Sequence, residues 1–416
     1  MAKICIEGGT TLNGRVKVSG AKNAALTAMC AALLSKEPVF LENFPKISDV
    51  LIMTKIIEDL GAKTFWESED CLMIDASGGL DHVTPYEMVK KLRASNLLLG
   101  PLLARTGKTN IALPGGCNIG SRPMDLHIKG LNSLGAQVEL EHGVIKAKTK
   151  SLTGARIYLD FPSVGATENI MMAAAVAKGV TIIENVAKEP EIVDLANLLN
   201  SMGARVRGAG TDIIKIDGVE ELAGTRYAII PDRIEAGTFM VAAGATGGKV
   251  FVDNVIPTHL EPITAKLQEA NVEVVEGDET IYVNGEFQRK PVDIKTLPYP
   301  GYPTDMQSQM MALLATTSGT SIIVENIFEN RLQVADELKR MGAKIKIQGR
   351  TAVVEGVRRL EGAQVRASDL RAGAALIIAG LTATGTTEID NVHFIDRGYE
   401  KLEEKFIGLG AKINRI

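Results

Sequence analysis

The chain has 416 residues, of which 45% are hydrophobic and 23% are charged. This composition is typical of a soluble globular protein, and the length predicts two domains of about 200 residues each. The net charge of −4 gives no indication of a nucleic-acid or membrane-surface protein. Because no apolar run approaches the roughly 18 residues of a membrane span, we expect no membrane-spanning segment.

The cysteines are scattered along the chain, at Cys5, Cys30, Cys71 and Cys117, without a CxxC pair. This spacing favours reduced thiols in a cytosol over a disulfide framework or a zinc site. The opening residues 1–6 are typical of a strand and lack the apolar region of a signal peptide. We therefore expect a cytoplasmic protein that needs no metal and no cofactor.

Two sequence markers show that the chain repeats one unit six times. A Leu/Met-Gly-Ala sequence, typical of a helix end, recurs about every 70 residues. Its glycines are Gly61, Gly135, Gly203, Gly342 and Gly410, and Asn271 fills the remaining gap. The second marker is a β-branched run that closes in asparagine, at Asn43, Asn185, Asn254, Asn326 and Asn391. One copy of this second marker is missing, and its expected place is near residue 114.

Each unit begins with a helix of small apolar residues, followed by a turn and a β-branched strand. An amphipathic helix and short strands complete it, with residues 191–199 as a clear example of the amphipathic helix. The first helices are apolar on nearly all sides, so we expect them to be buried. Three units per domain predict two similar α/β lobes with a cleft between them. We expect residues 22–230 in lobe 1, and residues 1–21 and 231–416 in lobe 2.

The missing marker coincides with an unusual loop, residues 113–127, which holds three glycines and two prolines around Cys117. Glycine allows the backbone a positive φ and close approach to a ligand. Arg122 follows five residues after the cysteine, and a neighbouring guanidinium lowers the pKa of a thiol. The loop therefore indicates a reactive cysteine, although a surface loop with an incidental thiol is the alternative.

Basic residues recur where the helices of the units are expected to begin. The first helices should begin around Lys22, Arg93, Glu168, Arg233, Asp305 and Arg371. The second helices should begin around Lys46, Arg122, Lys188, His259, Arg331 and Arg397. A cation at a helix N-terminus is unfavourable to the helix dipole, but helix N-termini and arginines together bind anions well. Solvated surface residues would explain any one position, whereas the whole set favours a polyanionic ligand held between the lobes.

Three further residues allow both a structural and a functional interpretation. Asp305 could be a first-turn acid of its helix, or it could act as a general base or orient a substrate hydroxyl. Asp369 carries the same two interpretations, with the helix cap favoured. His127 follows the cysteine loop and could tune that site, but a buried structural histidine is at least as consistent with its position.

These residues resemble those of the UDP-N-acetylglucosamine 1-carboxyvinyltransferases, the enolpyruvyl transferases of peptidoglycan synthesis, over essentially the whole chain. The resemblance rests on two segments of the first half, 20–26 and the cysteine loop 113–127. In the second half it rests on 303–307, 329–331 and 393–400, the last of which contains Asp-Arg-Gly-Tyr-Glu. It implies two inside-out α/β lobes of three repeats each. It also implies transfer of the enolpyruvyl group of phosphoenolpyruvate to the 3-hydroxyl of UDP-N-acetylglucosamine, with release of phosphate.

The resemblance also implies a role for each site residue. Cys117 would protonate the methylene carbon of phosphoenolpyruvate and react with the epoxide fosfomycin, and Asp305 would take the proton of the attacking hydroxyl. The anions of phosphoenolpyruvate would be bound by Lys22, Arg122 and Arg397, with support from Arg93, Arg331 and Arg371. Asn23 would contact the sugar side of the site. The remaining substrate contacts would come from Pro123, Met124, Asp125, Leu126, Ser163, Val164, Gly165, Ile327, Phe328 and Asp369. Residues 113–124 would close as a lid, and we expect a monomer.

Three alternatives remain to be weighed against this interpretation. The sister enzyme acting on shikimate 3-phosphate has Asp-Lys-Ser where this chain has Ala21-Lys22-Asn23, and it lacks the cysteine loop. A non-catalytic paralogue that binds the UDP-sugar would be expected to have lost Cys117 or Asp305, and both are present. A redox sensor would usually need a resolving cysteine nearby. Some relatives have a lysine at the position of Ser48. Any role of that lysine in phosphate binding would fall to Lys46 in this chain or be absent.

Overall fold

The computed structural model describes residues 2–84, 86–90, 92–113, 120 and 123–416. The described chain forms two compact units. Unit 1 contains the residues up to Ser19 and those from Pro231 onwards, and unit 2 contains the described residues of 20–113 and 123–230. The expected lobes grouped residues 20 and 21 with the start of the chain, whereas the structure groups them with the residues that follow.

Unit 1 contains three four-stranded sheets, and each has one parallel edge strand beside antiparallel neighbours. The first sheet is β21 (Gln364–Arg366), β22 (Thr386–Asp390), β1 (Ile4–Glu7) and β23 (Lys412–Arg415). The second is β15 (Glu273–Glu276), β16 (Thr280–Asn284), β14 (Lys249–Asp253) and β2 (Asn13–Lys17). The third is β17 (Ile294–Lys295), β18 (Thr320–Val324), β20 (Thr351–Glu355) and β19 (Lys344–Gln348). The strand expected near the start of the chain is β1, and β2 follows it in a different sheet.

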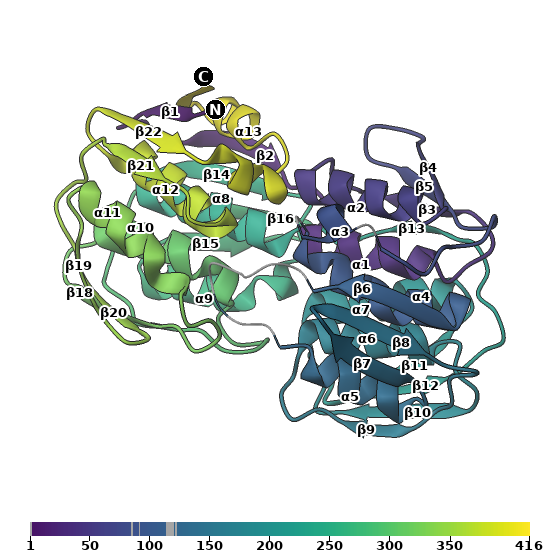
Figure 1. The fold of residues 1–416 in the computed structure, drawn as a ribbon. Coiled ribbons are helices and arrows are strands. Elements are labelled where there is room, and N and C mark those ends of the chain that lie inside the picture. The colour runs from purple at the N-terminus through teal and green to yellow at the C-terminus, as the bar shows by residue number, and fades with distance from the viewer. Residues whose placement is uncertain (1, 85, 91, 114–119, 121–122) are drawn as a thin grey trace. The chain divides into compact units, whose positions relative to one another are not determined.

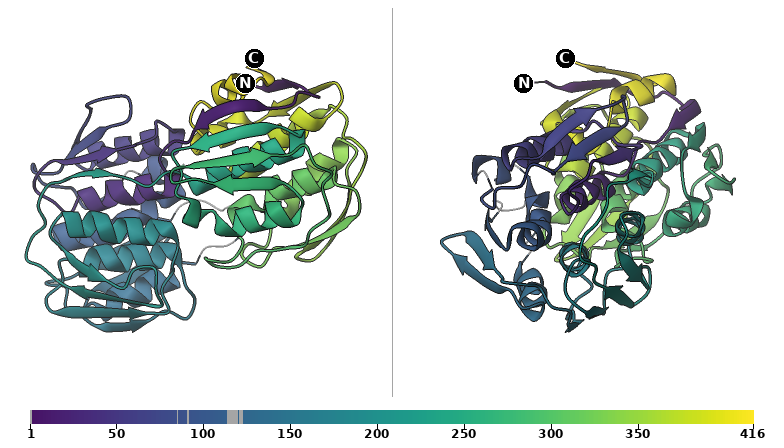
Figure 2. Two further views of the ribbon diagram at one scale, coloured as in Figure 1. Left: turned by 180° about the vertical axis from the view of Figure 1, so that it is seen from behind. Right: turned by 90° about the vertical axis from the view of Figure 1, so that its right-hand side faces the viewer.

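Three helices pack against one another inside unit 1 (Figure 1), and Figure 2 shows the teal strands β14 and β16 lying over them from behind. They are α8 (Arg233–Thr246), α10 (Gln307–Ala315) and α12 (Leu370–Thr382). Their Ala, Gly and Met residues are buried on all sides, which is the pattern expected of a core helix. The outer helices are α9 (Glu261–Glu269), α11 (Val334–Arg340) and α13 (Leu402–Gly408). Short 3-10 turns are η2 (Pro257–His259), η3 (Thr304–Met306), η4 (Arg331–Gln333) and η5 (Val392–Arg397).

Unit 2 repeats this arrangement, with one sheet reduced to three strands. Its first sheet is β13 (Arg226–Ala228), β3 (Val39–Glu42), β5 (Leu72–Asp75) and β4 (Lys63–Trp66). The second is β11 (Arg205–Arg207), β12 (Ile213–Asp217), β10 (Val180–Glu184) and β9 (Arg156–Tyr158). The reduced sheet is β6 (Lys108–Ala112), β8 (Val144–Lys148) and β7 (Gln137–Glu141). The inner helices are α1 (Lys22–Ala32), α4 (Leu99–Thr106) and α6 (Val164–Ala174). The other helices are α2 (Ser48–Asp59), α3 (Tyr86–Val89), η1 (Arg93–Leu98), α5 (Asp125–Ser133) and α7 (Pro190–Ser201).

The glycine marker has a conformational cause. All five marker glycines follow a helix and have φ between 89° and 105°. Asn271, the degenerate copy, has φ of 65°. Asparagine tolerates the left-handed region better than other side chains, so it can take the place of glycine in the fourth unit. The two α/β lobes of three repeats that the sequence predicted are therefore found in the structure.

The asparagine marker joins each strand to its parallel neighbour. Each side-chain amide donates a hydrogen bond to a backbone carbonyl at the end of the parallel edge strand. The bonds run from Asn43 to Ile229 (3.0 Å), Asn185 to Leu159 (2.7 Å), Asn254 to Val18 (2.7 Å), Asn326 to Thr296 (3.1 Å) and Asn391 to Ala367 (3.3 Å). The marker is absent after β6, and in the described chain this sheet has only a single parallel bridge, between Val83 and Asn110. The missing marker and the missing edge strand thus go together.

Two expectations about helix starts were wrong. Helix α6 begins at Val164 rather than near Glu168, because the Ser163 hydroxyl caps it by accepting a hydrogen bond from the Ala166 amide. In the second series, Arg331 begins turn η4, but other basic residues precede their helices. For example, Lys188 stands two residues before α7 and Arg397 five residues before α13. In the part of the chain that the structure describes, no helix is long and apolar enough to cross a membrane.

Candidate active site

A buried ion-pair cluster in unit 1 surrounds Asp305. This aspartate lies in turn η3, between the end of the β17 segment and helix α10. Its Oδ1 atom is 2.7 Å from Nη1 of Arg331, and its Oδ2 atom is 3.1 Å from Nη2 and 3.2 Å from Nε of Arg371. The two arginine side chains are each 3% exposed, and that of Asp305 is 28% exposed. The carboxylate is therefore the accessible member of the cluster.

The charge of Asp305 follows from this geometry. Burial opposes ionisation of the carboxyl group, but the guanidinium groups of Arg331 and Arg371 outweigh burial and hold its pKa well below the usual range. Asp305 is thus an ionised hydrogen-bond acceptor at neutral pH. A carboxylate of low pKa is a weak base, so it can take a proton only from a hydroxyl group that has become acidic.

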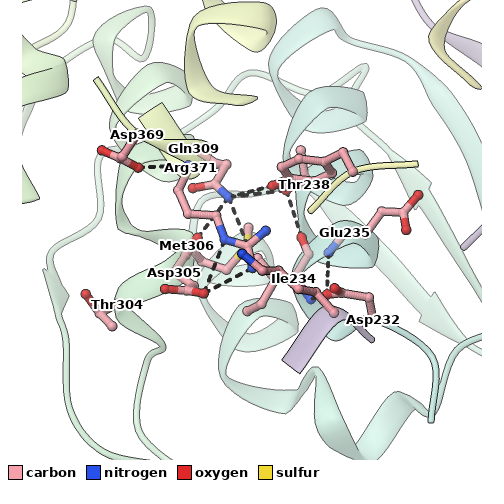
Figure 3. Close-up of polar contacts among 12 residues, drawn as sticks. Asp232, Ile234, Glu235, Thr238, Thr304, Asp305, Met306, Gln309, Asp369 and Arg371 are labelled. Atoms are coloured by element: carbon pink, nitrogen blue, oxygen red, sulfur yellow. Dashed lines mark hydrogen bonds and ion pairs between the residues drawn. The ribbon is translucent and has the colours of Figure 1, made fainter. Parts of the chain in front are cut away.

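A network of uncharged groups holds the cluster in place (Figure 3). The side-chain amide of Gln309 donates to the backbone carbonyl of Asp305 (2.9 Å) and to the Thr238 hydroxyl (3.2 Å). That hydroxyl donates to the carbonyl of Ile234 and also lies 2.9 Å from the Tyr399 hydroxyl. The Tyr399 ring in turn lies under Arg371, with 5.3 Å between guanidinium carbon and ring centroid. Helices α8, α10 and α12 thus fix the position of the Asp305–Arg371 pair together.

The other candidates of unit 1 differ in position and role. Asp369 caps helix α12, because its carboxylate accepts hydrogen bonds from the amides of Arg371 (2.8 Å) and Ala372 (3.0 Å). The favoured structural interpretation of Asp369 is therefore what the structure shows. The Phe328 ring lies 5.5 Å from the guanidinium carbon of Arg331. Arg397 is half-buried at the end of η5.

In unit 2, Lys22 begins helix α1 and makes an ion pair with Asp49 of α2, at 2.7 Å between Nζ and Oδ2. The Asp49 side chain is 1% exposed and that of Lys22 is 11% exposed. The buried carboxylate therefore fixes the position of the Lys22 ammonium group. Asn23 is the next residue on the same helix and is exposed.

The segments 123–126 and 163–165 of unit 2 meet at His127. The imidazole is 6% exposed, and a Cβ atom on Gly165 would lie 3.2 Å from its Cε1 atom. Its Nδ1 atom lies 3.0 Å from the side-chain nitrogen of Asn169. Burial lowers the pKa of His127 to about 4. His127 is therefore a buried structural histidine beneath these two segments.

The remaining candidates of unit 2 lie around helix α5 and turn η1. Arg93 begins η1, and Asn96 of the same turn donates its side-chain amide to the sulfur of Met124 (3.2 Å). Asp125 begins α5, and Leu126 packs against the core of the unit. Pro123 is exposed.

Two central candidates, Cys117 and Arg122, lie outside the described residues, as does most of the expected lid 113–124. The candidates that the structure does describe fall into both units, and the expected cleft between the lobes stays a prediction. Among the described residues, no group of three His, Cys, Asp or Glu side chains could hold a metal ion.

The geometry can be compared with known proteins. A family model described as EPSP synthase (3-phosphoshikimate 1-carboxyvinyltransferase) matches residues 6–406. A UDP-N-acetylglucosamine 1-carboxyvinyltransferase 2 of Carboxydothermus hydrogenoformans is 57% identical over 419 residues, covering 100% of both chains. The chain belongs to the UDP-N-acetylglucosamine 1-carboxyvinyltransferase family. A further member, from Caldanaerobacter subterraneus subsp. tengcongensis, is 55% identical over 99% of each chain. As a member of this carboxyvinyltransferase family, the chain is a transferase enzyme.

Solved structures show the same fold in more distant members of the wider group. The enolpyruvyl transferase NikO from Streptomyces tendae superimposes with a TM-score of 0.89 at 25% identity, covering 100% of this chain and 98% of NikO. An EPSP synthase from Acinetobacter baumannii gives a TM-score of 0.79 at 20% identity, covering 100% of both chains. The carboxyvinyltransferase family therefore shares its fold with the shikimate enzyme, whose sequence is much less similar to this one.

Sequence reasoning missed several residues that support the site. Asp49, the partner of Lys22, gave no signal, because an aspartate early in a helix is ordinary. Gln309 and Thr238 lie within helices that are otherwise apolar. The one signal in the sequence was a polar residue on a helix that was expected to be buried. Glu325 was missed as well, although it directly precedes the Asn326 marker.

Proposed function

We propose that this chain transfers the enolpyruvyl group of phosphoenolpyruvate to the 3-hydroxyl of UDP-N-acetylglucosamine and releases phosphate. The observation that carries the proposal is the full-length match, at 57% identity, to a relative named for this activity. The buried arginines around Asp305 support it, because both substrates carry several negative charges and guanidinium groups suit phosphate and carboxylate.

Asp305 takes the proton of the attacking hydroxyl in this proposal. Its low pKa fits a late proton transfer, since the hydroxyl becomes acidic only as its oxygen bonds to an electron-deficient carbon. Arg331 and Arg371 hold the carboxylate in place, and its 28% exposure leaves an edge open to the sugar. This arrangement orients the hydroxyl before it assists the reaction.

Cys117 supplies the proton that makes the carbon electron-deficient. The thiol protonates the methylene carbon C3 of phosphoenolpyruvate, and the sugar oxygen then bonds to C2. In the second half of the reaction, C3 returns its proton to the sulfur and the bond from C2 to the phosphate oxygen breaks. The proton of the sugar hydroxyl leaves with the phosphate. Lys22, Arg122 and Arg397 stabilise the leaving phosphate and the carboxylate throughout.

The remaining contacts bind the sugar nucleotide. The uridine diphosphate lies against residues 123–126 and 163–165, where the first amides of helix α6 are available to an anion. Arg93 supports the anionic site, Asn23 contacts the sugar, and the backbone at Ile327 and Phe328 completes the contacts. Asp369 contributes by capping the first turn of α12, which fixes the backbone of Arg371.

Wider consequences follow from the same proposal. The product enters peptidoglycan synthesis, so the enzyme acts in the cytoplasm and its loss disturbs cell shape and division. Fosfomycin alkylates Cys117. The enzyme works as a monomer, without metal or cofactor.

The test is phosphate release from phosphoenolpyruvate, with and without UDP-N-acetylglucosamine, in the wild type and in Cys117→Ala. We expect release that requires the sugar nucleotide and is lost in the variant. Cys30→Ala is the matched control, because Cys30 is a buried thiol of helix α1. No release in the wild type, with the nucleotide still bound, would support the regulatory paralogue instead.

A further inference from the structure

The five asparagine markers are each preceded by an acidic residue. In four units this residue ends the strand itself, as Glu42, Glu184, Asp253 and Asp390. Each of these four is partly exposed and pairs with an arginine of the adjacent parallel strand. The pairs are Glu42–Arg226 (2.8 Å), Glu184–Arg156 (2.6 Å), Asp253–Arg15 (2.7 Å) and Asp390–Arg366 (3.8 Å). The common role of the acidic residue is therefore an ion pair on the outer face of the sheet.

The fifth unit departs from this pattern by one residue. Strand β18 ends at Val324, and the acidic residue follows as Glu325. Because successive side chains alternate between the faces of a strand, a shift of one residue turns the side chain to the opposite face. Glu325 is accordingly 0% exposed, and within the described chain it makes no ion pair. Asn326 still donates to the parallel strand, but it lacks the positive φ of the other four marker asparagines, so the backbone differs here as well.

Four donors surround the Glu325 carboxylate. Its Oε2 atom accepts from the Thr304 hydroxyl (2.8 Å), and its Oε1 atom accepts from the Thr296 hydroxyl (2.9 Å). Oε1 also accepts from the backbone amides of Ile327 (2.8 Å) and Phe328 (3.1 Å). A carboxylate buried without a cation needs such donors. They tie three separate segments of unit 1 to one side chain.

Two of these segments carry residues of the candidate active site. Thr304 is followed directly by Asp305, and its hydroxyl also accepts a contact of 3.4 Å from Nη1 of Arg331. That same Nη1 atom makes the 2.7 Å ion pair with Asp305. Phe328, held through its backbone, lies under the Arg331 guanidinium at 5.5 Å. The Glu325 carboxylate thus fixes the two segments between which the Asp305–Arg331 pair is held.

We propose that Glu325 is a positioning residue for the sugar-nucleotide half of the reaction. It acts through Thr304 and through the backbone of Ile327 and Phe328, and it sets the orientation of Asp305 toward the acceptor hydroxyl. The proposal rests on the proposed function. It adds a residue that touches no substrate and whose inward direction distinguishes the fifth unit from the other four.

The test compares Glu325→Ala with Glu184→Ala, which removes the equivalent outward-facing acid of another unit. We expect kcat/KM for UDP-N-acetylglucosamine to fall about 10- to 100-fold in Glu325→Ala, because small displacements of a catalytic group have effects of this size. The KM for phosphoenolpyruvate should stay unchanged, and Glu184→Ala should resemble the wild type. Glu325→Gln keeps an oxygen for the two backbone amides and should recover part of the loss. Circular dichroism reports the folded fraction of each variant.

Thr304→Val provides a second route, because it removes the hydroxyl while keeping the shape of the side chain. It should reproduce part of the loss, and the double variant should be no worse than Glu325→Ala alone. The proposal is overturned if a folded Glu325→Ala matches Glu184→Ala, if the KM for phosphoenolpyruvate rises as well, or if the two losses multiply. Should Glu325→Ala fail to fold, an unaffected Thr304→Val would overturn it alone. An inactive wild type would instead contradict the proposed function.

Discussion

The protonation of His127 gives a quantitative test of how unit 2 is built. The Asn169 amide beside it has a fixed orientation, because its oxygen accepts a hydrogen bond from the Gly100 amide (2.7 Å) and its nitrogen donates to the carbonyl of Asn96 (3.0 Å). The nitrogen therefore also donates to Nδ1 of His127, which must be unprotonated. A proton on Nδ1 would place two donors against each other in a buried site.

The magnitude follows from the pKa of His127, which burial lowers from 6.5 to about 4. An unfolded chain binds the proton below pH 6.5, whereas the folded chain does not, so acid favours the unfolded state. Full stability is present above pH 6.5 and is lost progressively down to pH 4. Between pH 8 and pH 5 this linkage costs about 2 kcal/mol, at 1.36 kcal/mol per pKa unit.

The assay is urea unfolding, followed by circular dichroism, at several pH values between 8 and 5. His127→Asn keeps an acceptor for Asn169 but cannot titrate, so its stability should change with pH by about 2 kcal/mol less than that of the wild type. His142→Asn is the matched control, since His142 is exposed at a turn with φ of 49° that asparagine tolerates. Equal pH dependence in the wild type and His127→Asn would refute the reasoning.

Two further predictions concern the ion-pair cluster and the asparagine marker. Asp305→Asn should lower kcat by on the order of 10²- to 10⁴-fold, measured by phosphate release. The arginines keep Asp305 ionised. Its contribution to the stability of the fold is therefore lost only as the pH falls below about 3.9, the pKa of an aspartate in the unfolded chain. Titration of Asp305 should therefore cause no change in the rate of the wild type between pH 5 and 9. A change in rate over this range that disappears in Asp305→Asn would contradict this prediction. Directly after β10, Asn185→Gly keeps the positive φ but loses the 2.7 Å bond to Leu159, so urea unfolding should show a loss of about 1 kcal/mol. Asn185→Ala should lose about 1–2 kcal/mol more from backbone strain, and equal stability of the two variants would show that the conformation does not matter there.

The repeat architecture could be predicted from the sequence because its markers have strict conformational causes. A helix that ends in a left-handed residue needs glycine or asparagine, so Gly203 and Asn271 are visible in the sequence without any structure. The inner helices were visible because they are apolar on all sides. The number of units and the placing of Asp305 and Arg371 at helix starts followed from these patterns.

The side-chain partners could not be predicted, because they come from residues far apart in the sequence. Asp305 and Arg371 are 66 residues apart, and Lys22 meets an aspartate from another helix. The start of α6 was misplaced because Ser163 was given only a binding role, whereas its hydroxyl is the helix cap. A sequence also does not show on which face a strand-end side chain lies, which is why the inward direction of Glu325 needed the structure.

The position of strand β1 has a consequence for biosynthesis. Its residues pair with β22 and β23, so that Ile4 lies opposite Ile389 and Arg415, and Lys3 and Ile416 exchange backbone hydrogen bonds of 2.8 and 2.9 Å (Figure 1). Unit 2 has all its sheets within one continuous stretch of chain. During translation, unit 2 can complete its core while β1 and β2 are still unpaired. Their partner strands lie more than two hundred residues later in the chain and are synthesised afterwards. The first strand to be synthesised is thus among the last to be paired, and removal of β23 by an early stop codon would leave one edge of β1 uncovered.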